Sequence, residues 1–581
     1  MSRNNKNIYA ILVTGIALFV CSGIVAQDKP FDTIQVNVIT RYKPTIHDAV
    51  KLNSNPAVAD TLHLQKNVKY ELENTQYPTS YTPPLIPPMQ IKEGAPENFY
   101  HSLLNLGVGN FNTLYGEYFF NSVRSHNTDY GIHLNHLSSE YTTAGYGYSG
   151  FAFNDVDGYF QKFFTRHTLD LQAGFDNHIL HDYGYDIVRF PDLGNDLMRA
   201  RYDEYKGSLQ YASVLRDSSK INEDIKLSYY NFGETDGFNA GDYYFFNPLE
   251  NNVSGNMKFF TYFNQQRIDV RVSGEYNEYS SSNPIYRQIP FPTRFSINTF
   301  NGTFNPYFST YEKHWDAHLG VNVSYASNLP DNYSNVNVYP DLLARYHIAQ
   351  DVVMIYAGID GNQKLNTYKS LADENPFVVV QVPTPFQYTY TPYHVFGGLA
   401  GNITSQLTYN ASVSQSMLRN MPLFITDVFV AYNNQFYAAY DNVKISNLHA
   451  DVDYKWKNNL SVILGGDYNV YNTTNQLKAW YCPALKLSAM GKYTLQKKYI
   501  FKAEFFVVGS QYAPVETDDG IITGAKTLAG YPDLNLGLEY RYNKVFTAFL
   551  NLNNIANVAY YTWDNYEMMR FNLLVGIRLG F

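Results

Sequence analysis

The sequence lacks an apolar run long enough for a membrane-spanning helix. Such a helix needs about 20 consecutive apolar residues. The one apolar run that approaches this length, from about Ile8 to Val20, is shorter and lies near the start. If this chain crosses a membrane, it therefore crosses as β-strands, the other fold that satisfies every backbone polar group in lipid.

Cysteine and positive charge are also scarce, and each shortage excludes a class of protein. Cys21 and Cys482 are the only 2 cysteines, so loss of the N-terminal segment would leave no intramolecular disulfide. The formal net charge of -9 argues against a nucleic-acid partner, which requires a concentrated basic surface.

Motifs of common enzymes and cofactor sites are missing. The sequence has no phosphate loop, no Gly-x-Ser-x-Gly elbow and no paired-cysteine zinc pattern. We therefore expect neither catalysis nor a bound cofactor.

Aromatic residues are abundant. With 54 Tyr and 38 Phe they make up 17% of the chain, although the mean hydropathy is only -0.32. Aromatic girdles at the membrane interfaces of β-barrels account for such a composition better than an ordinary soluble core does.

The N-terminal segment predicts a secretory signal peptide over residues 1–26. Arg3 and Lys6 precede the apolar run, and small residues lead to Ala26. An alternative places a lipid on Cys21, but the bulky Val20 stands where a lipoprotein signal has a small residue. Residues 27–98 that follow are polar and end in a proline-rich stretch, so we expect a periplasmic arm and linker there.

From residue 99 to 581 the chain consists of alternating apolar and polar segments separated by Asn, Asp, Gly and Ser clusters. In residues 267–276, Ile268 and Val272 share one face, and Asp269 and Arg271 lie on the other. Alternation of this kind predicts strands with one lipid-facing and one watery side.

The connections between these segments alternate in length. Turns such as RYNK are tight, whereas every second connection is mostly long; the first hairpin, NFNT, is a short exception. The sequence thus predicts an all-β fold, a transmembrane antiparallel β-barrel of about 22 strands with short periplasmic turns and long extracellular loops. The longest expected loops span residues 184–200, 233–246, 370–390, 419–440 and 513–530.

The last twelve residues, RFNLLVGIRLGF, alternate to the end of the sequence. We expect their apolar row to face lipid, to close the sheet against a strand beginning near Tyr100, and to act as a signal for the barrel-assembly machinery. Asn572 and Arg578 should then point into the lumen. The assembly-signal residues are Phe571, Leu573, Val575, Ile577, Leu579 and Phe581.

The final 31 residues resemble the closing strands of TonB-dependent receptors, the energised importers of the outer membrane. The matching positions are Asn551, Leu552, Asn553, Asn554, Ile555, Tyr560, Tyr561, Trp563, Arg570, Phe571 and Phe581. The resemblance implies an outer-membrane location, a barrel of about this strand count, and ligand uptake powered through TonB.

The chain departs from this family before the barrel. Such receptors fill their barrel with a plug domain of well over a hundred residues, but only 72 residues (27 to 98) precede the first expected strand. A lumen of 22 strands is too wide for its own side chains to fill. We expect the arm, inward-folded external loops or another protein to fill it.

A second, shorter resemblance lies near the expected mature N-terminus. The segment from Asp32 to Val38, DTIQVNV, is similar to the TonB-contacting box of such receptors, and it could add as a strand to a periplasmic partner. The alternative is an apolar, strand-like fragment without that role. The candidate contact residues are Asp32, Thr33, Ile34, Gln35 and Val36.

The best candidates for metal ligands lie in the stretch DNHILHDYGYD. They are Asp176, His178, His181 and Asp182, with Asp186 farther along. Imidazole and carboxylate groups bind transition metals only when the fold brings them to one centre. The simpler interpretation is a set of polar residues at the water interface.

Three functional hypotheses remain at this point. The first is an outer-membrane barrel that takes part in nutrient or ligand uptake. The second is a scaffold that holds a surface lipoprotein or another membrane complex, and the third is a passive pore. The cargo is not encoded in any motif, since specificity rests on loop geometry.

Overall fold

The computed structural model describes residues 11–12 and 100–581, except 124, 126, 192, 195–197, 215–220, 236–246, 265, 283–293, 329–332, 350–351, 381–385, 429–431 and 518. The chain divides into two compact units, Met1–Val36 with Tyr100–Phe581 and Asn37–Phe99, and all described residues belong to the first. The predicted arm and the candidate TonB-contact segment therefore lie outside the described residues.

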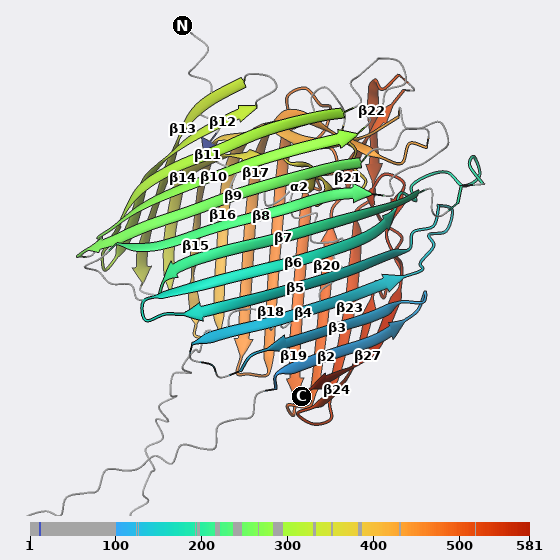
Figure 1. Ribbon diagram of the computed structural model, residues 1–581, viewed down its shortest axis with the longest axis horizontal. Coiled ribbons are helices and arrows are strands. Elements are labelled where there is room, and N and C mark those ends of the chain that lie inside the picture. Colours follow the sequence, from blue (N-terminus) through green and yellow to red (C-terminus); the bar gives the residue numbers. More distant parts are fainter. Residues whose placement is uncertain are drawn as a thin grey trace, which may run out of the picture. The chain divides into compact units, whose positions relative to one another are not determined.

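A single antiparallel sheet closes on itself and forms the β-barrel (Figure 1). It contains 23 strands, of which the two-residue β1 (Ile11–Leu12) is a parallel addition beside β15, so 22 strands form the wall. This confirms the predicted fold class and strand number. The wall strands are β2 (Ser102–Gly109), β3 (Leu114–Asn121), β4 (Thr128–Ser139), β5 (Phe151–Phe163), β6 (His167–His181), β7 (Arg199–Ser213), β8 (Asn222–Thr235), β9 (Asn247–Phe263), β10 (Gln266–Ser282), β11 (Arg294–Tyr311), β12 (Trp315–Asn328), β13 (Tyr333–Ala349), β14 (Val353–Leu365), β15 (Tyr388–Thr404), β16 (Leu407–Thr426), β17 (Phe436–Trp456), β18 (Leu460–Thr473), β19 (Leu485–Leu495), β20 (Tyr499–Val508), β23 (Tyr531–Arg541), β24 (Phe546–Asn553) and β27 (Asn572–Gly580).

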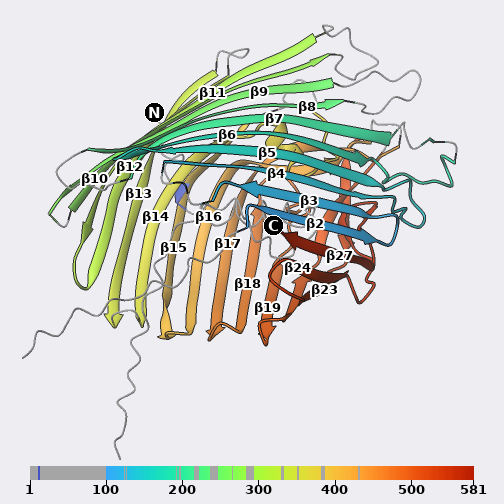
Figure 2. The same cartoon turned by 60° about the horizontal axis from the view of Figure 1, so that its bottom comes forward.

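The first and last wall strands pair with each other, so the sheet has no open edge. The register of β2 and β27 runs from Leu103 opposite Gly580 to Gly109 opposite Leu574. Beyond the strand ends, Ser102 and Phe581 exchange backbone hydrogen bonds of 2.8 and 2.9 Å. Figure 2 shows these strands side by side. Closure removes the unpaired groups that an edge would expose to lipid.

The two faces of the wall differ as the alternation predicted. On β10, Ile268 is 49% exposed on the outer face, whereas its neighbour Asp269 is fully buried on the lumenal face. On β27, Val575 and Ile577 are exposed, and Arg578 bonds to lumenal side chains. The outer face is therefore the lipid-facing one, and the lumen is polar.

Short turns and long loops alternate around the barrel, with some differences from the expected boundaries. The predicted loop 419–440 is shorter, because β16 and β17 continue to Thr426 and from Phe436. The predicted loop 513–530 contains a hairpin, β21 (Gln511–Glu516) and β22 (Ile522–Leu528). β17 has 21 residues, more than the about 9–11 that a strand needs to cross the hydrocarbon layer, and its pairing with β16 continues to its outer end.

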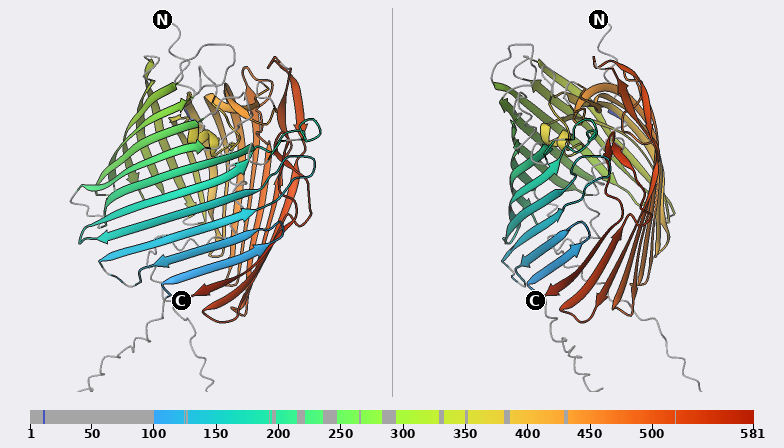
Figure 3. Two further views of the ribbon diagram at one scale, coloured as in Figure 1. Left: turned by 45° about the vertical axis from the view of Figure 1, so that its right-hand side comes forward. Right: turned by 90° about the vertical axis from the view of Figure 1, so that its right-hand side faces the viewer.

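Several long loops fold inward rather than away from the barrel. They contain the short helix α2 (Tyr368–Ala372) and the small hairpin of β25 (Tyr561–Trp563) and β26 (Tyr566–Glu567). Figure 3 shows α2 within the ring of strands. A buried apolar cluster joins these loops to the lumenal face of the outer strand ends. Among the described residues, no helix is long and apolar enough to cross a membrane.

Candidate functional site

Trp563, in the loop between β24 and β27, is the centre of a buried aromatic cluster at the outer ends of the strands. This side chain is only 1% exposed. Its ring centroid lies 4.8 Å from Tyr481, in the loop between β18 and β19, and 5.1 and 5.6 Å from Phe424 and Phe436 on the wall. One aromatic residue thus joins two loops to strands β16 and β17.

Tyr566 extends this core to two further loops. Its ring stacks on Phe377, with centroids 3.7 Å apart, and meets the edge of Tyr183 at 4.8 Å. Its hydroxyl donates a hydrogen bond to the backbone oxygen of Asn434. Loops from distant parts of the chain therefore converge on one apolar cluster, which we call the mouth core. The mouth core consists of Phe377, Phe424, Phe436, Trp480, Tyr481, Trp563 and Tyr566.

Helix α2 is held to the wall by carboxylates of β8 and β9. Glu250 on β9 accepts hydrogen bonds from the backbone amides of Tyr368 at 2.6 Å and Lys369 at 3.2 Å. The Tyr368 hydroxyl donates to Glu234 on β8. Because a helix N-terminus presents unpaired amides, Glu250 stabilises a helix too short to form alone.

The loop after β6 is fixed by Asp182. Its carboxylate accepts a hydrogen bond of 2.9 Å from Gln435, and its backbone oxygen accepts one of 2.7 Å from Asn434. Burial raises the pKa of Asp182 to about 7. Because Tyr566 also bonds to Asn434, the protonation of Asp182 is coupled to the segment against which Tyr566 packs.

Below the mouth, the lumenal wall carries a network of ion pairs across the closing seam. Glu539 on β23 lies 2.6 Å from Lys502 on β20 and 3.1 Å from Arg578 on β27. Arg578 donates to Asn105 at 2.9 Å, and Asn105 donates to Glu117 at 2.8 Å. This seam network joins the end of the barrel to its beginning.

The same row of charges continues along β4 to β7. His133 lies 3.2 Å from Glu117 and 3.8 Å from Asp157. Lys206 follows, 3.2 Å from Asp157 and 2.6 Å from Asp176. Opposite charges alternate along this wall, so it offers hydrated polar contacts without a strong net field.

The structure does not bring together the four predicted metal candidates, Asp176, His178, His181 and Asp182. Asp176 and His178 face the lumen, where they contact Lys206 and Asp155. His181 and Asp182 lie at the outer end of β6 and bond to loops. Within the described part of the chain, no group of three His, Cys, Asp or Glu residues could hold a metal ion.

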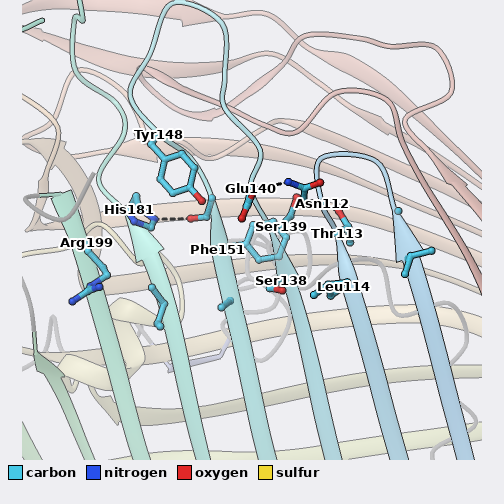
Figure 4. Close-up of a pocket in the computed structure, with 15 residues that line it drawn as sticks. Asn112, Thr113, Leu114, Ser138, Ser139, Glu140, Tyr148, Phe151, His181 and Arg199 are labelled. Carbon is cyan, nitrogen blue, oxygen red and sulfur yellow. Dashed lines mark hydrogen bonds between the residues drawn. The ribbon is translucent and has the colours of Figure 1, made fainter. Parts of the chain in front are cut away.

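A groove of about 780 Å³ lies at the outer ends of β2 to β7 (Figure 4). It includes the lipid-facing side chains of Val108 and Leu114, so it opens on the outward side of the barrel. Asn112 donates a hydrogen bond of 2.6 Å to Glu140 within it. We assign no ligand to this groove, and the lumen remains the candidate path.

Sequence reasoning located some of these residues and missed others. Arg578 was predicted to point into the lumen, and Trp563 is one of the positions that resemble the closing strands of TonB-dependent receptors. Glu250 carried no signal, because its partners on α2 are more than a hundred positions away. Only the inward fold of the loop that carries α2 reveals this contact.

No protein-family model matches the chain, and no curated protein matches it by sequence. Solved structures do match. The FrpB iron transporter from Neisseria meningitidis aligns with a TM-score of 0.64 and 11% identity over 84% of this chain and 82% of that chain. The pyoverdine receptor FpvA from Pseudomonas aeruginosa gives 0.61 and 12% over 84% and 79%.

The ferric-catecholate import receptor Fiu from E. coli K12 gives a TM-score of 0.61 and 11% identity over 84% of this chain and 82% of that chain. Identities this low establish the fold and leave the ligand open. The named neighbours are transporters and receptors rather than enzymes, in agreement with the expectation from the sequence. With its closed barrel of 22 strands and lipid-facing outer surface, the chain has the fold of the TonB-dependent receptors of the outer membrane.

Proposed function

We propose that this protein is an outer-membrane receptor that takes up a ligand through its lumen, with its own external loops as the gate. The observation that carries the proposal is the mouth core. Aromatic side chains from three loops and from strands β16 and β17 pack together on the lumenal side of the wall, and Trp563 and Tyr566 are at most 1% exposed.

This arrangement opposes a passive pore. Opening the mouth would expose several large aromatic side chains, each of which contributes about 1.5–3 kcal/mol when buried. Spontaneous opening would therefore be rare, whereas a ligand or an applied force could supply the required free energy. A closed mouth above a polar lumen supports gated uptake.

The energy source we propose is TonB, acting on the segment from Asp32 to Val38. An extended segment can pair with an exposed sheet edge of a periplasmic partner, and main-chain hydrogen bonds then give affinity without a precise side-chain match. The resemblance of DTIQVNV to the TonB-contacting box supports this part of the proposal.

The test is direct binding of the full-length barrel to the purified periplasmic domain of TonB. Replacing residues 32–38 by the same residues in scrambled order should weaken binding at least tenfold. A scramble of an equal length within residues 74–80 is the matched control. Equal binding of all three proteins would contradict the TonB assignment.

Purification in mild detergent tests the receptor proposal against the scaffold alternative. A receptor should be isolated alone and should retain its closed barrel, seen as heat-dependent migration on a gel. A stoichiometric companion protein that stays bound through purification would overturn the receptor assignment in favour of a scaffold.

A further inference from the structure

Two cations face each other across neighbouring strands near the short-turn end of the barrel. The register of β9 and β10 places Lys258 directly opposite Arg271. Like charges in directly opposed positions of a sheet destabilise it. A pair of this kind requires an explanation, because cations elsewhere on the wall, such as Lys206 and Lys502, lie beside carboxylates.

A third cation, Arg267, lies on the same face of β10. Ile268 and Val272, which directly follow these positions, are exposed on the lipid-facing side, so Arg267 and Arg271 point into the lumen. The three residues Lys258, Arg267 and Arg271 are called the basic patch below.

The carboxylates near the basic patch have other partners as well, and Asp341 on β13, which attracts Arg271, lies 3.1 Å from His318. Asp269 is fully buried and pairs with Arg267 at 2.6 Å, while Lys258 is farther from it at 3.9 Å. On β8, Asp224 is opposite Lys258, but its carboxylate accepts a hydrogen bond from Gln210. Lys226 on β8 adds another lumenal cation. The short-turn ends of these three strands thus carry four lumenal cations and two carboxylates, since Glu234, Glu250 and Glu275 lie farther toward the outer ends.

Aromatic rings position the cations and leave their charge in place. The guanidinium of Arg267 lies 4.1 Å from the ring centre of Phe260, and the Lys258 ammonium lies 5.7 Å from the same centre. Arg271 lies 4.4 Å from the centre of Tyr307 and donates a hydrogen bond of 2.7 Å to its hydroxyl. Contacts with ring faces hold a cation without consuming all its N–H donors.

The seam network provides the contrast. There, Glu539 lies between Lys502 and Arg578, and each cation is within 3.1 Å of a carboxylate oxygen. In the basic patch, Arg271 has an aromatic hydroxyl as its hydrogen-bond acceptor, and the Nε of Arg267 has no partner among the described residues. The seam network therefore uses its cations to hold the barrel together, whereas the basic patch leaves hydrogen-bond donors available to a ligand.

We propose that the basic patch binds an anionic ligand on its way through the lumen, through carboxylate or phosphate oxygens. A guanidinium provides a planar fork for such oxygens, and the ammonium adds a charged donor on the neighbouring strand. This proposal rests on the proposed uptake function and adds the chemical class of the ligand, a multivalent oxyanion.

The experiment is isothermal titration of the full-length barrel in detergent with pyrophosphate and, separately, with citrate, at low ionic strength. The double variant Lys258→Gln, Arg271→Gln should bind the anion that the wild type prefers at least tenfold more weakly. Lys455→Gln is the matched control, because Lys455 also lies near a short turn but has Asp453 at 2.7 Å.

Thermal unfolding separates a binding role from a structural one. Since the double variant removes a like-charge pair, its melting temperature should equal or exceed that of the wild type. A lower melting temperature would assign the patch to stability and overturn the proposal, as would equal anion binding by both proteins or none by the wild type. Because titration in detergent needs no TonB, failure here is distinguishable from failure of the energised mechanism.

Discussion

Replacing Trp563 by alanine should loosen the mouth and leave the barrel intact. Removing a large aromatic side chain from a packed core costs about 3–5 kcal/mol. Trp563 contacts the loop residue Tyr481 and the outer ends of two wall strands, so the cost falls on the closed state of the loops. By the relation of about 1.4 kcal/mol per factor of ten, opening should become at least about 100-fold more frequent.

Hydrogen exchange of backbone amides measures this opening. The informative amides lie in the mouth. Those of Tyr481 and Phe436 join separate segments by donating to Tyr512 and Phe377, and that of Met568 donates to Tyr560 within the loop that carries Trp563, each at 2.9 Å. In Trp563→Ala these amides should exchange about 100-fold faster or more, while amides in the middle of the wall strands keep their rates.

Two further variants control the interpretation. Phe505→Ala removes a lipid-facing ring that is 43% exposed and should leave exchange in the mouth unchanged. Trp563→Phe should have a smaller effect than alanine, because it keeps a ring in the core and the indole Nε1 has no partner among the described residues. Unchanged exchange in the mouth of Trp563→Ala, or an equal increase throughout the wall, would refute the reasoning.

Three other predictions concern proton binding, the seam and assembly. Burial raises the pKa of Asp182 to about 7, from about 3.9 in an unfolded chain. The closed mouth should therefore lose stability as pH rises from 4 to 7, by at most about 4 kcal/mol, and lose no more above pH 7. The ratio of the wild-type exchange rate to that of Asp182→Asn should increase between pH 5.5 and 8, and a constant ratio would contradict this prediction. Glu539→Gln leaves the buried Lys502 without its carboxylate partner and should lower the free energy of unfolding by about 3–5 kcal/mol. Gels should show this loss as a lower temperature of barrel unfolding, and the added substitution Lys502→Met should recover part of it. Phe581→Glu should reduce the folded barrel in the outer membrane, whereas Phe581→Leu should not; normal folded levels of the glutamate variant would oppose the assembly-signal role.

The wall of the barrel was predictable from the sequence because its rules are local. Alternation placed Asp269 inside and Ile268 outside, and the structure confirms both positions. The closing pair of β2 and β27 followed from the physical need to remove an edge. Strand number followed from counting alternating segments, since each segment has the same period wherever it lies in the chain.

The mouth was not predictable in the same way, because its contacts join residues far apart in the sequence. The expected loop 370–390 did not include a helix. Thr367 is the N-cap of α2, and Glu250 on another strand accepts hydrogen bonds from its first amides, a contact that the sequence does not show. The expected metal candidates failed to converge because successive residues of β6 point to opposite faces or reach different loops. Likewise, the Lys258–Arg271 pair appears only once the register is known.

The most direct test of the central claim, that the external loops close the lumen, is the conductance of the full-length wild-type protein in planar lipid bilayers. The account predicts no steady open-pore current in the wild type, and frequent opening events in Trp563→Ala. A large, steady conductance of the wild-type barrel without ligand would contradict it.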